Sequence, residues 1–97
     1  GNEIKRCSFA NEIVAITSAR TSDFFVVVAI VDSANDVYVF DAYLPGSRVL
    51  AGKLPSKPIS MTISTHEMAI IVLCESGVCL FIPLPLQALF PETLFNM

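Results

Sequence analysis

Two apolar runs joined by a short polar loop constrain this chain more than any other feature. Residues 24–31 (FFVVVAIV) are all apolar, and residues 37–40 (VYVF) resume the apolar pattern after the polar loop at residues 32–36 (DSAND). β-branched and aromatic residues favour strands, whereas Asn and Asp favour turns. The pattern therefore predicts a β-hairpin. A strand with one face in water alternates apolar and polar residues. These two strands do not alternate, so we expect both faces of the hairpin to be covered.

The same order of elements occurs a second time along the chain. The first copy comprises residues 12–17, 24–31 and 37–40, and the second comprises residues 59–64, 68–74 and 78–82. Ile13 lies 46 positions before Ile59, and Phe40 lies 41 positions before Phe81, because the second copy has shorter loops. An internal repeat with a period in the low to middle forties is typical of the blades of a β-propeller.

A more polar strand completes the first copy. Residues 47–54 (SRVLAGKL) carry Arg48 and Lys53, which predicts an exposed outer strand. A propeller blade is a four-stranded antiparallel sheet with similar sheets packed on both faces. The predicted fold class is therefore all-β, with antiparallel sheets that form about two β-propeller blades, a partial propeller. The first blade with its N-terminal lead-in spans residues 1–54, the second spans 55–83, and an irregular C-terminal tail spans 84–97.

The C-terminal tail departs from the strand pattern. Prolines at positions 83, 85 and 91 exclude a normal central strand. We expect either a broken outer strand followed by a helical turn or an arm that docks on a partner, with a frayed end as the alternative. The expected interaction residues of the tail are its apolar side chains Leu86, Leu89, Phe90, Leu94 and Phe95.

The composition is unusually apolar for so short a chain. Of 97 residues, 54% are hydrophobic and only 15% are charged, against a typical charged fraction of about 25%. A chain of this size buries only about 60–65% of its unfolded surface when it folds alone. We therefore expect neighbouring polypeptide, either other chains or the remainder of the same propeller, to bury part of its surface. The apolar runs are far shorter than the ~20 residues that cross a bilayer, so no membrane partner is expected.

Charge and cysteine content narrow the class of protein further. The net charge is −3, and the scattered bases do not form the basic face that nucleic-acid binders usually show. The N-terminal residues GNEIKRC contain no apolar signal region, which favours an intracellular protein with reduced thiols. The chain has three cysteines, Cys7, Cys74 and Cys79, which together with His66 make four possible zinc ligands. No two of these cysteines have the CxxC spacing of a typical zinc site. We expect structural thiols that behave as small hydrophobes, with a metal site or a disulfide as the alternative.

No group of residues forms a catalytic or cofactor-binding signature. Asp32, Asn35 and Asp36 carry oxygen ligands, but their loop lacks the glycine of a calcium-binding loop, so a solvated hairpin loop is expected. Asp41 is expected to accept hydrogen bonds in a turn, with a site at a propeller rim as the alternative. For His66 to act as a general base it would need a nucleophile and an orienting acid nearby, and the sequence shows no recognisable pattern of these. The sequence therefore predicts a protein that is not an enzyme and binds no cofactor or metal.

Part of the chain resembles the WD-repeat family. Residues 32–41 (DSANDVYVFD) resemble its strand–turn–strand unit, with Phe40-Asp41 where the family has Trp-Asp. Residues 75–82 (ESGVCLFI) are a weaker second copy that ends in Phe81-Ile82 without an acid. Both copies lack the upstream Gly-His pair of the family, so its buried hydrogen-bond tetrad is not expected. The resemblance covers residues 12–83 and implies a propeller fold.

The link between the two copies resembles the C-terminal propeller of HIR/HIRA-type histone-chaperone subunits. The matching residues, within residues 46–63, are Gly46, Arg48, Leu54, Pro55, Ser56 and Pro58. This resemblance implies a scaffold that oligomerises and docks partner subunits, and it implies a nuclear, chromatin-associated complex.

The expected function is a non-enzymatic protein–protein interaction scaffold, part of a WD40-like propeller in a larger complex of the nucleus or cytoplasm. The alternative is a self-contained small all-β structural subunit that homodimerises through an apolar face. A fragment of a propeller enzyme whose site residues lie elsewhere is a third hypothesis.

Overall fold

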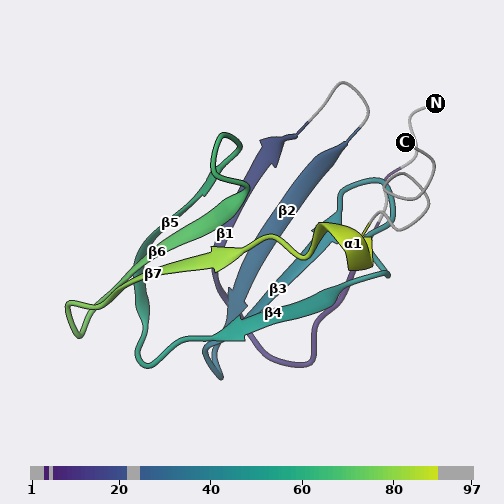
Figure 1. The fold of residues 1–97 in the computed structure, drawn as a ribbon. Helices are drawn as coiled ribbons and strands as arrows, with labels where there is room; N and C mark the ends of the chain where they lie inside the picture. Colours follow the sequence, from purple (N-terminus) through teal and green to yellow (C-terminus); the bar gives the residue numbers. More distant parts are fainter. Residues whose placement is uncertain (1–3, 5, 22–24, 90–97) are drawn as a thin grey trace.

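The computed structural model describes residues 4, 6–21 and 25–89, and it has an antiparallel all-β fold (Figure 1). The elements are β1 (Ile13–Arg20), β2 (Val26–Asp32), β3 (Asp36–Asp41), β4 (Val49–Lys53), β5 (Pro58–Ser64), β6 (Ala69–Cys74), β7 (Cys79–Pro83) and α1 (Leu86–Leu89). Within the described residues they form a four-stranded sheet in the order β1-β2-β3-β4, here sheet A, and a three-stranded sheet β5-β6-β7, here sheet B. The predicted all-β class of antiparallel sheets is confirmed.

The central hairpin forms where the sequence predicts it. β2 pairs with β3 from Val27 opposite Asp41 to Val31 opposite Val37. The Asp32 carboxylate closes the turn by accepting the N–H groups of Ala34 and Asp36 at 3.0 and 3.1 Å. The left-handed φ of 66° in this turn falls on Asn35, a residue type that tolerates such a conformation.

The second copy forms a tighter meander of the same kind. Its hairpin turns at Gly77, whose φ of +91° favours glycine. After β7 the chain continues through Leu84 into the short helix α1 (Figure 1), so the expected helical turn is present in the described part of the tail. No strand follows β7 in sheet B among residues 4–89 that the structure describes.

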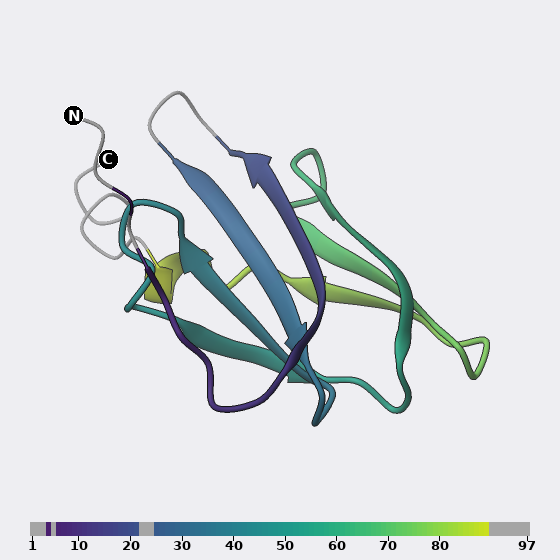
Figure 2. The same cartoon turned by 180° about the vertical axis from the view of Figure 1, so that it is seen from behind.

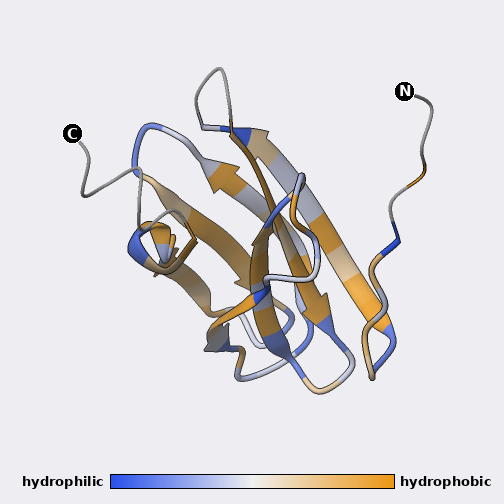
Figure 3. Ribbon diagram, turned by 90° about the vertical axis from the view of Figure 1, so that its right-hand side faces the viewer, coloured by the Kyte–Doolittle hydropathy of each residue, from blue (hydrophilic) through white to orange (hydrophobic). Residues whose placement is uncertain are grey.

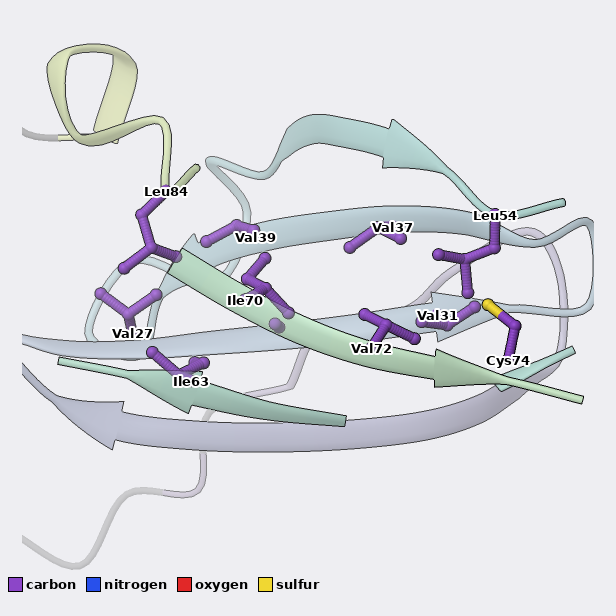
Figure 4. Close-up of a cluster of buried hydrophobic side chains, with 11 residues drawn as sticks. Val27, Val31, Val37, Val39, Leu54, Ile63, Ile70, Val72, Cys74 and Leu84 are labelled. Carbon is purple, nitrogen blue, oxygen red and sulfur yellow. The ribbon is translucent and has the colours of Figure 1, made fainter. Parts of the chain in front are cut away.

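The two sheets pack face to face around one apolar core (Figure 4). Its fully buried members come mainly from the inner strands of the two sheets: Val27, Ala29, Val31, Val37 and Val39 in sheet A, and Ile70, Val72 and Cys74 in sheet B. Leu54 and Leu84, which are 3% and 7% exposed, lie at opposite ends of this core. The core therefore belongs to both sheets together.

The outer face of sheet A is covered in part by the lead-in that precedes β1. In the view from behind, this segment lies across sheet A on the side that faces the viewer (Figure 2). The centre of the Phe9 ring lies 6.1 Å from that of Tyr38 and 6.0 Å from that of Phe40. The Arg48 guanidinium lies over the Phe9 ring at 4.2 Å. Both faces of the β2–β3 hairpin are thus covered, as predicted, but the outer cover is the chain's own lead-in.

Replacing Ile70 with alanine tests the shared core. Ile70 is fully buried between the sheets, so Ile70→Ala is expected to lower the free energy of unfolding by about 2–5 kcal/mol through lost burial and a cavity. The same change at Ile59, which is 65% exposed in β5, is expected to change it by no more than about 0.5 kcal/mol. Urea denaturation of both variants measures the difference, and equal losses would contradict this core.

Candidate interaction surface

Asp32 has a structural role at the end of β2. Besides the two backbone N–H groups of the turn, its carboxylate accepts a hydrogen bond from Asn11 Nδ2 at 3.2 Å, and the side chain is almost fully buried. Burial raises its pKa, but the hydrogen bonds from Asn11 and from the backbone of Asp36 and Ala34 outweigh this and hold the pKa of Asp32 below its ordinary value of 3.8. The carboxylate therefore joins the hairpin turn to the lead-in.

The Asp36 carboxylate and the backbone carbonyls of the hairpin loop are also engaged within the chain. Lys53 Nζ lies 3.3 Å from Asp36 Oδ1 and donates to the carbonyl of Ala34 at 3.1 Å. The Asn35 carbonyl accepts the N–H of Leu54 at 2.8 Å. Across the part of the chain that the structure describes, no three His, Cys, Asp or Glu side chains are grouped to hold a metal ion.

Asp41 and His66 occupy ordinary turn positions. Asp41 is 8% exposed, and its Oδ1 accepts the N–H of Tyr43 at 2.9 Å, which is the turn role expected for it. His66 is exposed in the β5–β6 turn, where Ser64 Oγ accepts the N–H of Glu67 at 3.1 Å. These contacts hold turns together and do not form a catalytic group.

The cysteines do not come together. Cys74 is fully buried and faces the core, whereas Cys79 is exposed, and both are free thiols. The hairpin register places Cys79 opposite Leu73, so the two thiols lie on opposite faces of sheet B. The expectation that Cys79 is a buried structural thiol is wrong, because odd-numbered residues of β7 point away from the core. Cys7, the third free thiol, contacts the Pro45 carbonyl at 2.9 Å.

A small pocket lies between the lead-in and sheet A. It has a volume of about 230 Å³ and is lined by Phe9, Ala10, Asn11, Asp32, Tyr38 and Arg48. Ligand pockets usually enclose about 300–1,000 Å³ and offer free polar groups. Here Asp32 is satisfied within the hairpin, and Arg48 donates to the Ser8 carbonyl at 2.8 Å while it stacks on Phe9. The pocket therefore has neither the volume nor the free polar groups of a typical small-molecule site.

Apolar side chains gather instead on the outer faces of the two sheets. Strands of both sheets are largely hydrophobic, and the connecting loops are mostly polar (Figure 3). On sheet B, Leu73 and Phe81 are 40% and 65% exposed, and on β1 of sheet A, Val14 and Ile16 are 46% and 68% exposed. Exposed apolar groups that lie together mark interaction surfaces in soluble proteins.

The predicted interaction residues of the tail divide into two groups. Leu86 and Leu89 are half-buried in α1 and pack against the shared core. Phe90, Leu94 and Phe95 lie outside the described residues. The partly exposed surfaces of the two sheets were not among the predicted sites. The sequence did indicate these surfaces, because residues 68–74 and 78–82 do not alternate between apolar and polar residues and so place apolar side chains on both faces of sheet B.

Comparison with known protein families, with curated proteins and with solved structures finds no match. No helix within residues 4–89 that the structure describes has the length and apolar character needed to cross a membrane.

The pH dependence of unfolding tests the role of Asp32. Because the folded-state pKa of Asp32 is lowered, its contribution to stability is present above the unfolded-state pKa and is lost as the pH falls through the folded-state pKa. The stability advantage of the wild type over Asp32→Asn is therefore expected to shrink as the pH falls below 3.8. Thermal melts of both proteins from neutral to acidic pH measure it. A difference that grows toward low pH would contradict the assignment.

Proposed function

We propose that this chain is a non-enzymatic protein–protein interaction scaffold, part of a WD40-like β-propeller in a larger intracellular complex. The observation that supports the proposal is the relative orientation of the two sheets. They are stacked in the same orientation, with β1 beside β5 (Figure 1). At most matched positions, the outer face of one sheet carries the residue types of the inner face of the other.

Equivalent positions in the two sheets follow from the strand registers. β1 and β5 each contain a bulge near their start, between Ile13 and Ala15 and between Pro58 and Ser60. Matching the bulges makes Pro58 the counterpart of Ile13. Along the hairpins, Ile82 becomes the counterpart of Phe40, because Ile30 pairs with Tyr38 and Val72 pairs with Leu80. The repeat is therefore offset by one position from each of the sequence alignments, Ile13 with Ile59 and Phe40 with Phe81.

The inner face of sheet A corresponds to the outer face of sheet B. On β1 the inner residues are Ala15, Thr17 and Ala19, and their counterparts on β5 are Ser60, Thr62 and Ser64. On β2 they are Val27, Ala29 and Val31, and on β6 they are Ala69, Ile71 and Leu73. Small residues on the first strand are thus followed by apolar residues on the second in both sheets.

The inner face of sheet B corresponds in turn to the outer face of sheet A. Met61, Ile70, Val72, Leu80 and Ile82 of sheet B match Ile16, Val28, Ile30, Tyr38 and Phe40 of sheet A. All of these residues are apolar or aromatic. Two further core residues of sheet B, Ile63 and Cys74, match the polar residues Ser18 and Asp32 of sheet A. The two faces that pack together inside the chain are therefore repeated at most positions on its outside, where no other sheet of the described residues packs on them.

Such an arrangement can be extended over the outer face of sheet B and over the β1 side of sheet A, which the lead-in leaves exposed. Contacts between unlike faces generate rings when the rotation between layers closes, and open stacks when it does not. β1 and β5 lie along one another as the closest strands of the two sheets, and the small side chains on the facing side of β1 permit this approach. A further sheet of the same kind would fit the outer face of sheet B as sheet B fits sheet A. The resemblance of residues 46–63 to histone-chaperone subunits suggests one kind of complex, a chromatin-associated one, in which this scaffold would act.

Two observations favour the alternative of a self-contained structural subunit. The core is closed at its two ends by Leu54 and Leu84, and the lead-in with Phe9 covers part of sheet A. This chain would then fold alone and homodimerise through an apolar face. A propeller segment is expected to be poorly soluble without a partner, whereas a self-contained subunit is expected to be soluble and to melt cooperatively.

A lysine on the outer face of sheet B tests the scaffold proposal. Leu73→Lys is expected to raise the solubility of the purified chain and to reduce its self-association, because burying a charged side chain opposes the packing of another sheet on this apolar face. The control Leu44→Lys adds the same charge at a residue that is 60% exposed in the turn after β3. Light scattering over a concentration series measures both variants. Equal effects of the two lysines would contradict the use of this face.

A further inference from the structure

The open edge of β7 is the least protected strand edge of the described residues. β1, β4, β5 and β7 each lack a neighbour on one side. The first three are interrupted by a register shift in their pairing with the adjacent strand, whereas β7 pairs with β6 without one. Bulges, charges and prolines are the usual means by which proteins prevent edges from pairing with other chains.

The other open edges also carry charges or prolines that β7 lacks along most of its length. β1 ends at Arg20, β4 ends at Lys53 and β5 begins at Pro58 beside Lys57. The β7 segment of residues 78–84 (VCLFIPL) contains no charged residue, and its only proline stands at the end of the strand. An uncharged edge can pair with its own copy without the like-charge contacts that destabilise opposed strands.

The hydrogen-bond pattern shows which backbone groups of β7 face outward. Cys74 donates its N–H to the Val78 carbonyl at 2.8 Å, and Leu84 donates to the Met68 carbonyl at 3.0 Å, at the two ends of the β6–β7 ladder. Because bonded residues alternate in an antiparallel ladder, Leu80 also bonds toward β6. The N–H and C=O groups of Cys79 and Phe81 therefore point to the open edge.

We propose that β7 pairs antiparallel with β7 of a second copy of this chain and joins two B sheets into one six-stranded sheet. A two-fold axis beside Leu80 sets Cys79 opposite Phe81 of the second copy, and Phe81 opposite its Cys79. Both residues on each strand offer one donor and one acceptor, so this register satisfies all of their outward groups with four hydrogen bonds.

The side chains suit the same register. Cys79 and Phe81 lie on the outer face, where the Phe81 ring is 65% exposed, and pairing places this ring beside the Cys79 side chain of the second copy. Leu80 lies on the inner side with the core and meets its own copy there. Pro83, which has no N–H to donate, falls beyond the paired residues, opposite the turn of the second copy. This pairing uses an edge, whereas the proposed scaffold uses faces, so the two are independent.

A proline at position 79 tests the pairing. Cys79→Pro removes an outward N–H and leaves the bonds to β6 intact, whereas Cys79→Ala keeps the N–H and serves as the matched control. Sedimentation velocity over a concentration series is expected to show a monomer–dimer equilibrium for the wild type and the alanine variant. The proline variant loses two of four hydrogen bonds, so its dimerisation is expected to be about thirtyfold weaker. A dimer of unchanged affinity, or a wild type that stays monomeric, would overturn the proposal.

The same measurement in a chain with Ile16→Lys and Leu73→Lys separates the edge from the faces. The charged faces cannot stack, so a dimer that persists in this chain and weakens with Cys79→Pro arises from the β7 edge. Loss of the dimer in the double lysine chain alone would assign it to the faces and would overturn the edge proposal.

Cross-linking tests the register even if the proline variant folds poorly. In Phe81→Cys, the new thiol lies opposite Cys79 of the second copy at a Cα separation of about 5.5 Å, within the range that disulfides span. Mild oxidation is expected to give a covalent dimer on a non-reducing gel. Adding Cys79→Ala is expected to abolish it, because residue 81 is then about 7–8 Å from its own copy. A dimer that survives this second change would overturn the register.

Discussion

The packing of sheet B on sheet A in the same orientation is the constraint on which the rest of the structure depends. Valines on the inner face of β2 and β3 meet Ile70 and Val72 of β6 across the core. Because both sheets point the same way, the contact joins two different faces. Each sheet thereby packs one face in the core and leaves the other, with similar side chains at most matched positions, on the outside. The apolar composition follows from this arrangement, since inner strands must be apolar on both faces.

The outer face of sheet A is partly covered by the lead-in, whereas the outer face of sheet B is not covered by any described residues. On sheet A the lead-in places Phe9 on Tyr38 and Phe40, and Arg48 covers the Phe9 ring. Ile30, which lies opposite Tyr38 in the β2–β3 pairing, is 2% exposed although it points away from the core. Sheet B has no comparable cover in the described residues, and Phe81 remains 65% exposed. The surface open to a further sheet is therefore concentrated on sheet B and on the β1 side of sheet A.

Much of this fold could be predicted from the sequence, because the unbroken apolar runs and the turn residues are local signals. The exact match between the two copies could not, because apolar runs that do not alternate fit two registers one residue apart equally well. The bulges and the strand pairings distinguish these registers. The side of Cys79 could not be predicted for the same reason, and this residue is exposed. The packing of the predicted lead-in on sheet A was also missed, because Phe9 contacts Tyr38 and Phe40, which lie far from it in the sequence.

The most direct test of a scaffold built from repeated faces is the accessibility of Thr62 in the natural assembly. Thr62 is exposed on β5 and is the counterpart of Thr17, which is half-buried between the sheets. A Thr62→Cys thiol, in a chain with Cys79→Ser, is expected to react rapidly with a maleimide in the purified chain and slowly in cells that normally make the protein. Equal rates in both settings, matching those of a Ser33→Cys control in the exposed hairpin loop, would contradict the account.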